Sequence, residues 1–155
     1  MRFAVRVFAD ASGSGRPSTL QVRRYCRFVG ADYSEMFDEL RDVYLEDSWV
    51  LALRQVDGQL TFDLDAVLTE SHPRYQVPKP GEQYDYLRAE LVVTGEDVLL
   101  ELSGAQPARD ATGQTDIGHV DAWHTDAAGW STLEGDWGSA RVLGARVRLS
   151  LTARD

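Results

Sequence analysis

The residues best suited to metal or proton chemistry lie close together between residues 118 and 124. His119 and Asp121 would project from the same face of a β-strand, because successive side chains alternate between its two faces. A zinc ion usually takes three or four protein ligands, so this pair needs a third. His72, in a proline-rich stretch, can supply it. Two interpretations stay open: a metal site formed by His72, His119 and Asp121, or, as we favour, a His–Asp pair on a polar sheet face.

A second group of side chains is suited to binding rather than to catalysis. Tyr84, Tyr86 and Arg88 recur at every second residue, so one face of a strand would carry all three. Tyrosine and arginine are enriched at the energetic centres of protein interfaces. Tyr75 lies nearby in the proline-rich stretch. We predict that these four residues form a protein-binding surface; the alternative is ordinary amphipathic surface cover.

Recognisable catalytic and cofactor motifs are absent from the sequence. It contains no Gly-x-Ser-x-Gly segment and no glycine-rich phosphate-binding loop. The single cysteine, Cys26, has no histidine near it in the sequence and is interpreted as a small buried apolar residue. We therefore expect no cofactor. The absence of these motifs favours a non-enzymatic protein and leaves an enzyme as the alternative.

Charge narrows the classes of partner. The chain of 155 residues has a formal net charge of −9, which disfavours a surface that follows nucleic-acid phosphates. A basic protein partner would be matched by this charge, although acidity also keeps proteins in solution. The charge is uneven, with a net +3 over residues 1–35 and −12 over residues 36–155.

The charge boundary near residue 35 bears on domain organisation. Length and composition fit a single domain over residues 1–155. Residues 11–18 are rich in glycine and serine, a composition typical of a flexible connection. Residues 1–35 are therefore either a native strand pair or a non-native, loosely attached extension that precedes a natural start at Met36. On the second interpretation, a chain that starts at Met36 would be as stable as the full chain.

Hydrophobic periodicity outlines the secondary structure. Apolar residues at helical spacing predict one short helix over residues 34–45, with Asp32 in its capping pair. The period then changes to two on either side of Asp57-Gly58, which predicts a β-hairpin with a type I′ turn. Residues 69–82, with three prolines, and residues 104–117 are expected to be loops. Further strands are predicted over residues 84–94, 98–102, 118–125, 129–134 and 139–152, with a bulge or bend at Gly144 in the last.

Six to seven strands joined mostly by short connections favour an antiparallel architecture. We predict a mainly β fold, either a sandwich or a partly closed barrel, with the one short helix near its start. Exposed sheet edges would permit a homodimer. No apolar run approaches the roughly 20 residues that span a bilayer, and the N-terminal residues lack the apolar core of a signal peptide. We accordingly expect a cytoplasmic protein that binds neither membranes nor nucleic acid.

Three segments carry a resemblance to other proteins: residues 45–51 (LEDSWVL), residues 68–75 (LTESHPRY) through 80–82 (PGE), and residues 133–138 (LEGDWG). They resemble small uncharacterised bacterial β-proteins that are in turn similar to immunity proteins of polymorphic toxin systems. The resemblance covers roughly residues 36–150 and carries no catalytic residues. It implies a non-enzymatic, immunity-type binding protein with a basic partner. The alternative is a small-molecule-binding barrel or a metal-assisted hydrolase that uses His72, His119 and Asp121.

Overall fold

The computed structural model describes residues 31–109 and 113–153, so Cys26 and the glycine- and serine-rich stretch lie outside the described residues. The elements in chain order are β1 (Ala31–Asp32), α2 (Tyr33–Met36), a 3₁₀ helix (Asp38–Leu40), β2 (Val43–Val56), β3 (Gln59–Leu68), β4 (Asp85–Thr94), β5 (Asp97–Leu102), β6 (Ala108–Arg109), β7 (Thr115–Asp116), β8 (Ala122–Thr125), β9 (Trp130–Gly135), β10 (Gly138–Leu143) and β11 (Arg146–Leu151).

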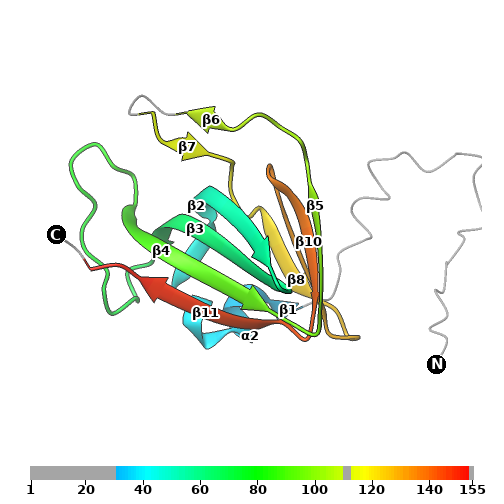
Figure 1. Ribbon diagram of the computed structural model, residues 1–155. Helices are drawn as coiled ribbons and strands as arrows, with labels where there is room; N and C mark the ends of the chain where they lie inside the picture. The colour runs from blue at the N-terminus through cyan, green and yellow to red at the C-terminus, as the bar shows by residue number, and fades with distance from the viewer. Residues whose placement is uncertain (1–30, 110–112, 154–155) are drawn as a thin grey trace, which may run out of the picture.

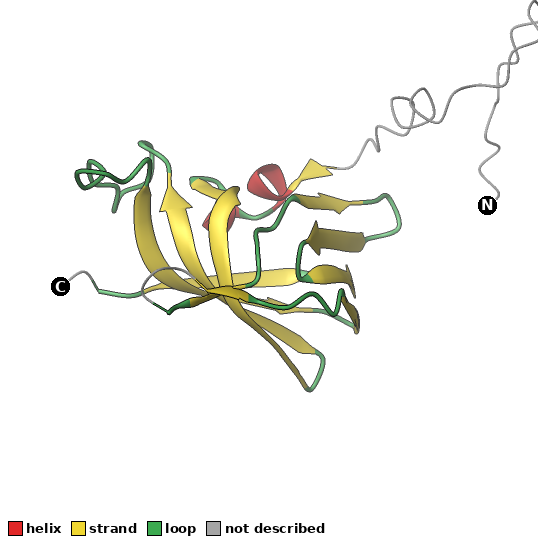
Figure 2. Ribbon diagram, turned by 90° about the horizontal axis from the view of Figure 1, so that it is seen from above, coloured by secondary structure: helices red, strands yellow, loops and turns green. Residues whose placement is uncertain are grey.

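The strands form two main antiparallel sheets. One has the order β11-β4-β3-β2 and the other the order β1-β8-β9-β10-β5, while β6 and β7 form a small separate pair. Figure 1 shows the first sheet with β5 and β10 beside it and the β6–β7 pair above. Figure 2 shows the short helix at the margin of the strands. The described residues form a sandwich-like arrangement and no closed barrel, which confirms the predicted mainly β class.

The β2–β3 hairpin is confirmed in position and in turn type. Asp57 and Gly58 have φ angles of 48° and 72°, and a type I′ turn requires positive values at both residues. On β3 the side chains of Leu60, Phe62 and Leu64 are fully buried, and the residues between them face the other side. The alternation read from the sequence therefore identifies the face of β3 that meets the core.

Two chain segments pass from one main sheet to the other at a shared corner. β4 continues into β5 through Gly95 and Glu96, and β10 continues into β11 through Gly144 and Ala145. The Glu96 backbone N–H donates to the Leu143 carbonyl oxygen at 2.8 Å, which ties the two passages together. Gly144 has a φ of 62°, so the bend predicted there is confirmed. It divides the strand expected over residues 139–152 into two strands that belong to different sheets.

The core combines aliphatic side chains from both main sheets with a few aromatic ones. Its completely buried members include Leu45, Val50, Phe62, Leu64, Leu91, Val93, Leu133 and Val142. Trp137, at the turn between β9 and β10, packs edge-on against Phe62 with ring centroids 5.4 Å apart. Val147, Leu149 and Leu151 of β11 pack against the same core, as their alternation predicts. The core thereby joins the two sheets into one body.

The helix is shorter than the sequence predicts. The predicted range of residues 34–45 overlaps α2, which begins at Tyr33, and then includes a 3₁₀ turn and the start of β2 at Val43. Asp32 caps α2 as expected, because its carboxylate accepts the Ser34 backbone N–H at 3.0 Å. Val43 instead pairs with Leu68 of β3. Pairing with a neighbouring strand in the folded protein therefore outweighs the tendency of these apolar residues to form a helix.

The structure also differs from the sequence prediction at residues 118–125 and at residues 104–117. The strand predicted over residues 118–125 begins only at Ala122, because the chain before it bonds to β2 instead. The Val50 N–H donates to the Gly118 carbonyl oxygen at 2.7 Å, and the Ile117 N–H donates to the Val50 carbonyl oxygen at 2.9 Å. The loop expected over residues 104–117 contains the β6–β7 pair. In the part of the chain that is described, no helix is long and apolar enough to cross a membrane.

Candidate functional site

An irregular stretch of β2 turns two aromatic side chains outward. The pairing of β2 with β3 shifts its register between Tyr44 and Trp49. Ser48 holds this irregularity, because its hydroxyl donates to the Tyr44 carbonyl oxygen at 2.6 Å and accepts the Val67 N–H at 2.9 Å. A β-bulge re-aims the side chains around it. Tyr44 and Trp49 are consequently 42% and 38% exposed.

The beginning of β4 adds two tyrosines to this region. Tyr86 and Arg88 point outward, because Leu87 and Ala89 alternate with them and are buried in the core. The Tyr84 ring, immediately before β4, lies edge-on to the Tyr86 ring with centroids 6.1 Å apart. The three side chains gather on the outer side of β4, as their spacing predicts.

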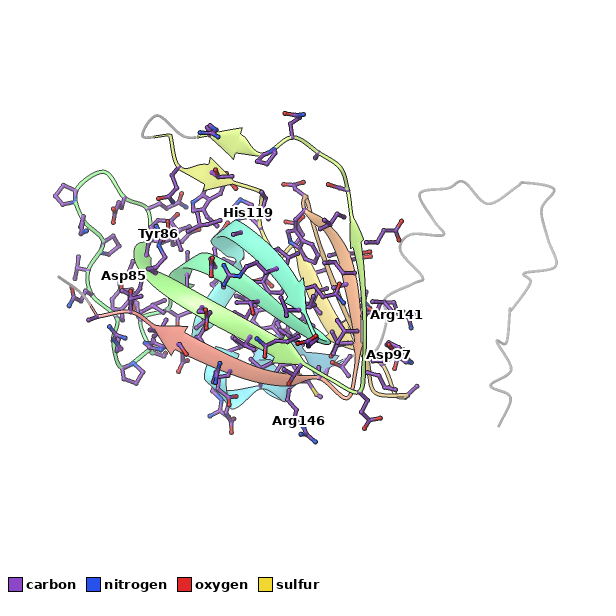
Figure 3. The ribbon with its side chains drawn as sticks, in the orientation of Figure 1. Asp85, Tyr86, Asp97, His119, Arg141 and Arg146 are labelled. Carbon is purple, nitrogen blue, oxygen red and sulfur yellow. The ribbon has the colours of Figure 1, made fainter. Side chains whose placement is uncertain are left out.

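Trp49 connects these tyrosines to His119. Its ring centroid lies 4.2 Å from that of His119, and it lines a shared hollow with Tyr86. His119 Nδ1 lies 3.0 Å from the Ser48 carbonyl oxygen, which can only accept, so Nδ1 carries the proton. We call Tyr84, Tyr86, Trp49 and His119 the aromatic row. Figure 3 shows Tyr86 and His119 at the end of the molecule away from Asp97 and Arg146.

Carboxylates surround the tyrosines of the aromatic row. A hydrogen bond with Asp47 is the main cause of a raised pKa of Tyr84. The pKa of Tyr86 is raised mainly by burial, and further by the charges of Asp47, Glu82 and Asp65. Nearby negative charge disfavours a phenolate, and the carboxylates of Asp47, Glu82 and Asp65 make the surroundings of the two tyrosines acidic.

Arg88 supports this surface through an ion pair and a hydrogen bond. Its Nε lies 3.1 Å from Asp65 Oδ1, and its Nη2 donates to Gln114 Oε1 at 3.1 Å. Gln114 in turn donates to Asp65 Oδ2 at 3.1 Å. The charge of Arg88 is therefore balanced mainly by Asp65, and the surface around the tyrosines stays acidic.

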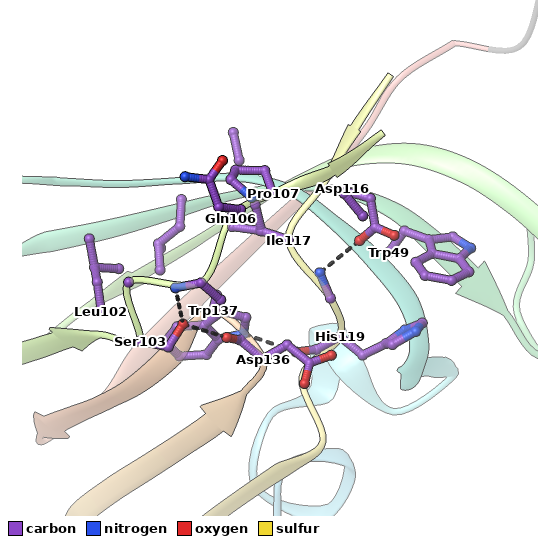
Figure 4. A pocket seen from close by; sticks show the side chains of 16 residues that line it. Trp49, Leu102, Ser103, Gln106, Pro107, Asp116, Ile117, His119, Asp136 and Trp137 are labelled. Carbon is purple, nitrogen blue, oxygen red and sulfur yellow. Dashed lines mark hydrogen bonds between the residues drawn. The ribbon is translucent and has the colours of Figure 1, made fainter. Parts of the chain in front are cut away.

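Two hollows flank Trp49. The larger hollow has a volume of about 640 Å³ and is formed by β2, the segment after β5, the segment before β8 and the β9–β10 turn (Figure 4). The smaller hollow, of about 450 Å³, lies beside Tyr86 and Glu82. Trp49 and Asp116 line both hollows. Among the described residues, neither lining includes a lysine or an arginine.

Hydrogen bonds between separate segments hold the walls of the larger hollow. The Trp137 indole N–H donates to the His119 carbonyl oxygen at 2.9 Å. The Ser103 hydroxyl donates to the Asp136 carbonyl oxygen at 2.7 Å. The β9–β10 turn is thus bonded both to the segment before β8 and to the segment after β5, so the hollow is preformed.

The three residues of the predicted metal site do not come together. His72 lies in the long loop between β3 and β4, where its Nδ1 accepts the Arg74 backbone N–H at 3.0 Å. His119 belongs to the aromatic row, and Asp121 is exposed just before β8. Residues 31–109 and 113–153 contain no group of three or more His, Cys, Asp or Glu side chains that could hold a metal ion. The sequence permits these three residues to meet, but the pairing of the strands does not bring them together.

The His–Asp pair that the sequence favours is also not formed. Residues 118–121 are not a strand, so the alternation that would align His119 with Asp121 does not apply. His119 bonds to the Ser48 carbonyl oxygen instead, and the Asp121 backbone N–H donates to the Glu134 carbonyl oxygen at 2.8 Å.

Tyr75 has a partly structural position. It packs against the hydrophobic core, and its backbone N–H donates to the His72 carbonyl oxygen at 2.9 Å. The neighbouring Gln76 N–H donates to the carboxylate of Asp85, which is 5% exposed, at 2.8 Å. These contacts anchor the long loop to the sheet, and direct contact of Tyr75 with a partner stays a prediction.

Tyr44, Asp47 and Trp49 lie at this surface, although their sequence pattern does not predict it. The period-two pattern places Trp49 on one face with Leu53, whereas Leu53 packs against the core and Trp49 is turned outward, because the register shifts between Val50 and Ala52. One signal was present, because the polar run Glu46-Asp47-Ser48 interrupts an otherwise apolar strand. Such an interruption is compatible with a bulge.

Comparison with known proteins provides no relative for this arrangement: no family model matches the chain, and no curated protein or solved structure matches it significantly.

Proposed function

We propose that this chain is a non-enzymatic, immunity-type binding protein that receives a basic protein partner on the aromatic row. The observation that carries the proposal is the gathering of the four rings of the row within one acidic surface. Tyrosine and tryptophan provide large, stiff contact areas that dominate interface energetics. The surrounding carboxylates complement a basic partner and steer its approach. We propose that this encounter takes place in the cytoplasm.

Capture of the partner from the protein's own cells tests the proposal. The bait proteins are the wild type, a Tyr86→Ala/Arg88→Ala variant and a control Arg146→Ala/Arg148→Ala variant, whose exposed arginines lie on β11. We expect the wild type and the control to retain the same basic protein, identified by mass spectrometry. The affinity of the Tyr86/Arg88 variant should fall roughly 30-fold or more, with an unchanged circular dichroism spectrum.

The salt dependence of the captured complex provides an independent measurement. Association with a basic partner should slow as ionic strength rises, because the attraction between the two surfaces is screened. An unchanged affinity of the Tyr86/Arg88 variant would remove this surface from the proposal. An acidic captured partner would overturn the proposed charge complementarity.

A further inference from the structure

The two hollows indicate how a partner would be recognised, an inference that rests on the proposed function. We propose that they receive two side chains of one extended partner segment, an apolar side chain in the larger hollow and a lysine or arginine in the smaller. Trp49 stands between the two positions, since it lines both hollows.

The larger hollow suits an apolar anchor. Its lining includes Leu53, Leu102, Pro107, Ile117 and Trp137. Leu102 is 64% exposed, so apolar surface at this site stays in contact with water in the free protein. Covering that surface favours association. The hydrogen bond between Trp137 and the His119 carbonyl holds the wall in place, so little ordering is needed on binding.

The smaller hollow suits a cation. Its lining combines the rings of Trp49 and Tyr86 with the carboxylates of Glu82, Asp116 and Asp65. Asp65 is paired with Arg88 at 3.1 Å, which leaves Glu82 and Asp116 as the main negative charges. A cation placed against aromatic faces and beside carboxylates is stabilised by both. Since none of the described lining residues is basic, this charge complementarity favours a basic side chain of the partner.

The two hollows share the boundary formed by Trp49 and Asp116, so neighbouring side chains of one partner segment can enter them. The Asp116 carboxylate accepts the Gly118 backbone N–H at 2.7 Å, which fixes the boundary that the hollows share. In an extended segment the side chains of residues i and i+2 point the same way, roughly 6–7 Å apart. One side chain can then lie on each side of the Trp49 ring. The expected partner motif is an apolar residue, any residue, and then arginine or lysine.

Titration of the isotope-labelled full chain with three short peptides, followed by NMR, tests this inference. The probe is acetyl-Phe-Gly-Arg-amide. Its two comparison peptides carry citrulline in place of arginine, which removes the charge, or glycine in place of phenylalanine, which removes the apolar anchor. We expect the probe to shift the Trp49 indole signal together with backbone signals of residues 102–108 and 116–119. Each comparison peptide should bind roughly tenfold more weakly.

Two pairs of matched variants locate the binding. Leu102→Ser should weaken binding of the probe roughly tenfold, whereas Leu99→Ser should not, because both leucines are exposed on β5 but Leu99 does not line the larger hollow. Glu82→Gln should weaken the probe severalfold, whereas Glu70→Gln, an exposed acid in the same loop, should not.

Any of three results would overturn the inference. The first is equal affinity for the arginine and citrulline peptides, which would show that charge is not recognised. The second is no binding of the probe, and the third is an equal effect of both members of a matched pair. If the Tyr86/Arg88 variant loses the captured partner while the probe does not bind, the proposed function stands and the two-hollow recognition fails.

Discussion

At the scale of single residues, Tyr33 links the start of the described chain to the stretch of β2 that presents Trp49. It is 4% exposed, and its hydroxyl donates to Glu46 Oε2 at 2.6 Å and accepts the Leu45 N–H at 3.1 Å. Its ring lies 6.0 Å from that of Trp123. Burial raises the pKa of Tyr33, and the hydrogen bond to Glu46 raises it further.

Replacing this hydroxyl should weaken the fold at neutral pH. We expect Tyr33→Phe to lower the free energy of unfolding by about 1–3 kcal/mol, because the Leu45 N–H and the Glu46 carboxylate lose their partner. In the wild type, the unfolded chain ionises tyrosine near the ordinary value of 10.0, whereas the folded chain resists ionisation. This stabilising contribution is therefore complete below the unfolded pKa and is lost as the pH rises through and above it.

Urea unfolding at about pH 8.5 and about pH 11 measures this dependence. The wild type should lose more stability across this interval than Tyr33→Phe does. Equal losses in the two proteins would contradict the assigned role of the Tyr33 hydroxyl.

At the scale of elements, β2 builds most of the site. Its irregular register turns Trp49 outward, while its hydrogen bonds with residues 117 and 118 bring His119 to the Trp49 ring. β4 contributes Tyr86 and Arg88 by simple alternation. The aromatic row therefore depends on one irregular strand, β2, and one regular strand, β4, which flank β3 in the same sheet.

The chain is closely packed at the corner where β4 continues into β5 and β10 continues into β11. A Cβ atom at Gly95 would lie 2.4 Å from Val142 Cγ1 and 2.5 Å from the Leu143 carbonyl oxygen. We expect Gly95→Ala to lower the free energy of unfolding by about 1–3 kcal/mol through overpacking. The adjacent exposed control, Glu96→Ala, should stay within about 0.5 kcal/mol of the wild type. Denaturant unfolding of both variants checks this, and a Gly95→Ala protein as stable as the control would contradict the close passage.

At the scale of the whole molecule, residues 31–35 pack with the rest of the described fold. Ala31 and Asp32 pair with Thr125 and His124 of β8, and Tyr33 belongs to the core. These contacts fall within the range of residues 1–35 that the charge pattern sets apart. They lead us to expect that the stability boundary lies before residue 31 rather than at Met36.

Two truncations locate this boundary. A chain that starts at Ala31 after an initiator methionine should exceed one that starts at Met36 by about 3–5 kcal/mol in unfolding free energy, since the second loses a buried aromatic side chain. Thermal and urea unfolding of both chains give the comparison. Equal stabilities would restore the interpretation of residues 1–35 as a loosely attached extension.

The features that could be read from the sequence alone are those with a local cause. The Asp57-Gly58 turn follows from the φ angles that these residues accept, and the buried faces of β3 and β11 follow from alternation within each strand. The outward positions of Tyr86 and Arg88 belong to the same group. The mainly β class follows because many such strands are joined by short connections.

The tertiary structure alone decided which of these faces meet. Trp49, Tyr86 and His119 come from three distant segments, and neither the β2 irregularity nor its bonds to residues 117 and 118 follow from local spacing. The same reason explains why the metal site predicted at His72, His119 and Asp121 is not formed. The residue types suit a metal ion, but the fold does not bring the three side chains together. Sequence periodicity specifies how a side chain leaves its own backbone, whereas a binding surface depends on hydrogen bonds and packing between strands far apart in the chain.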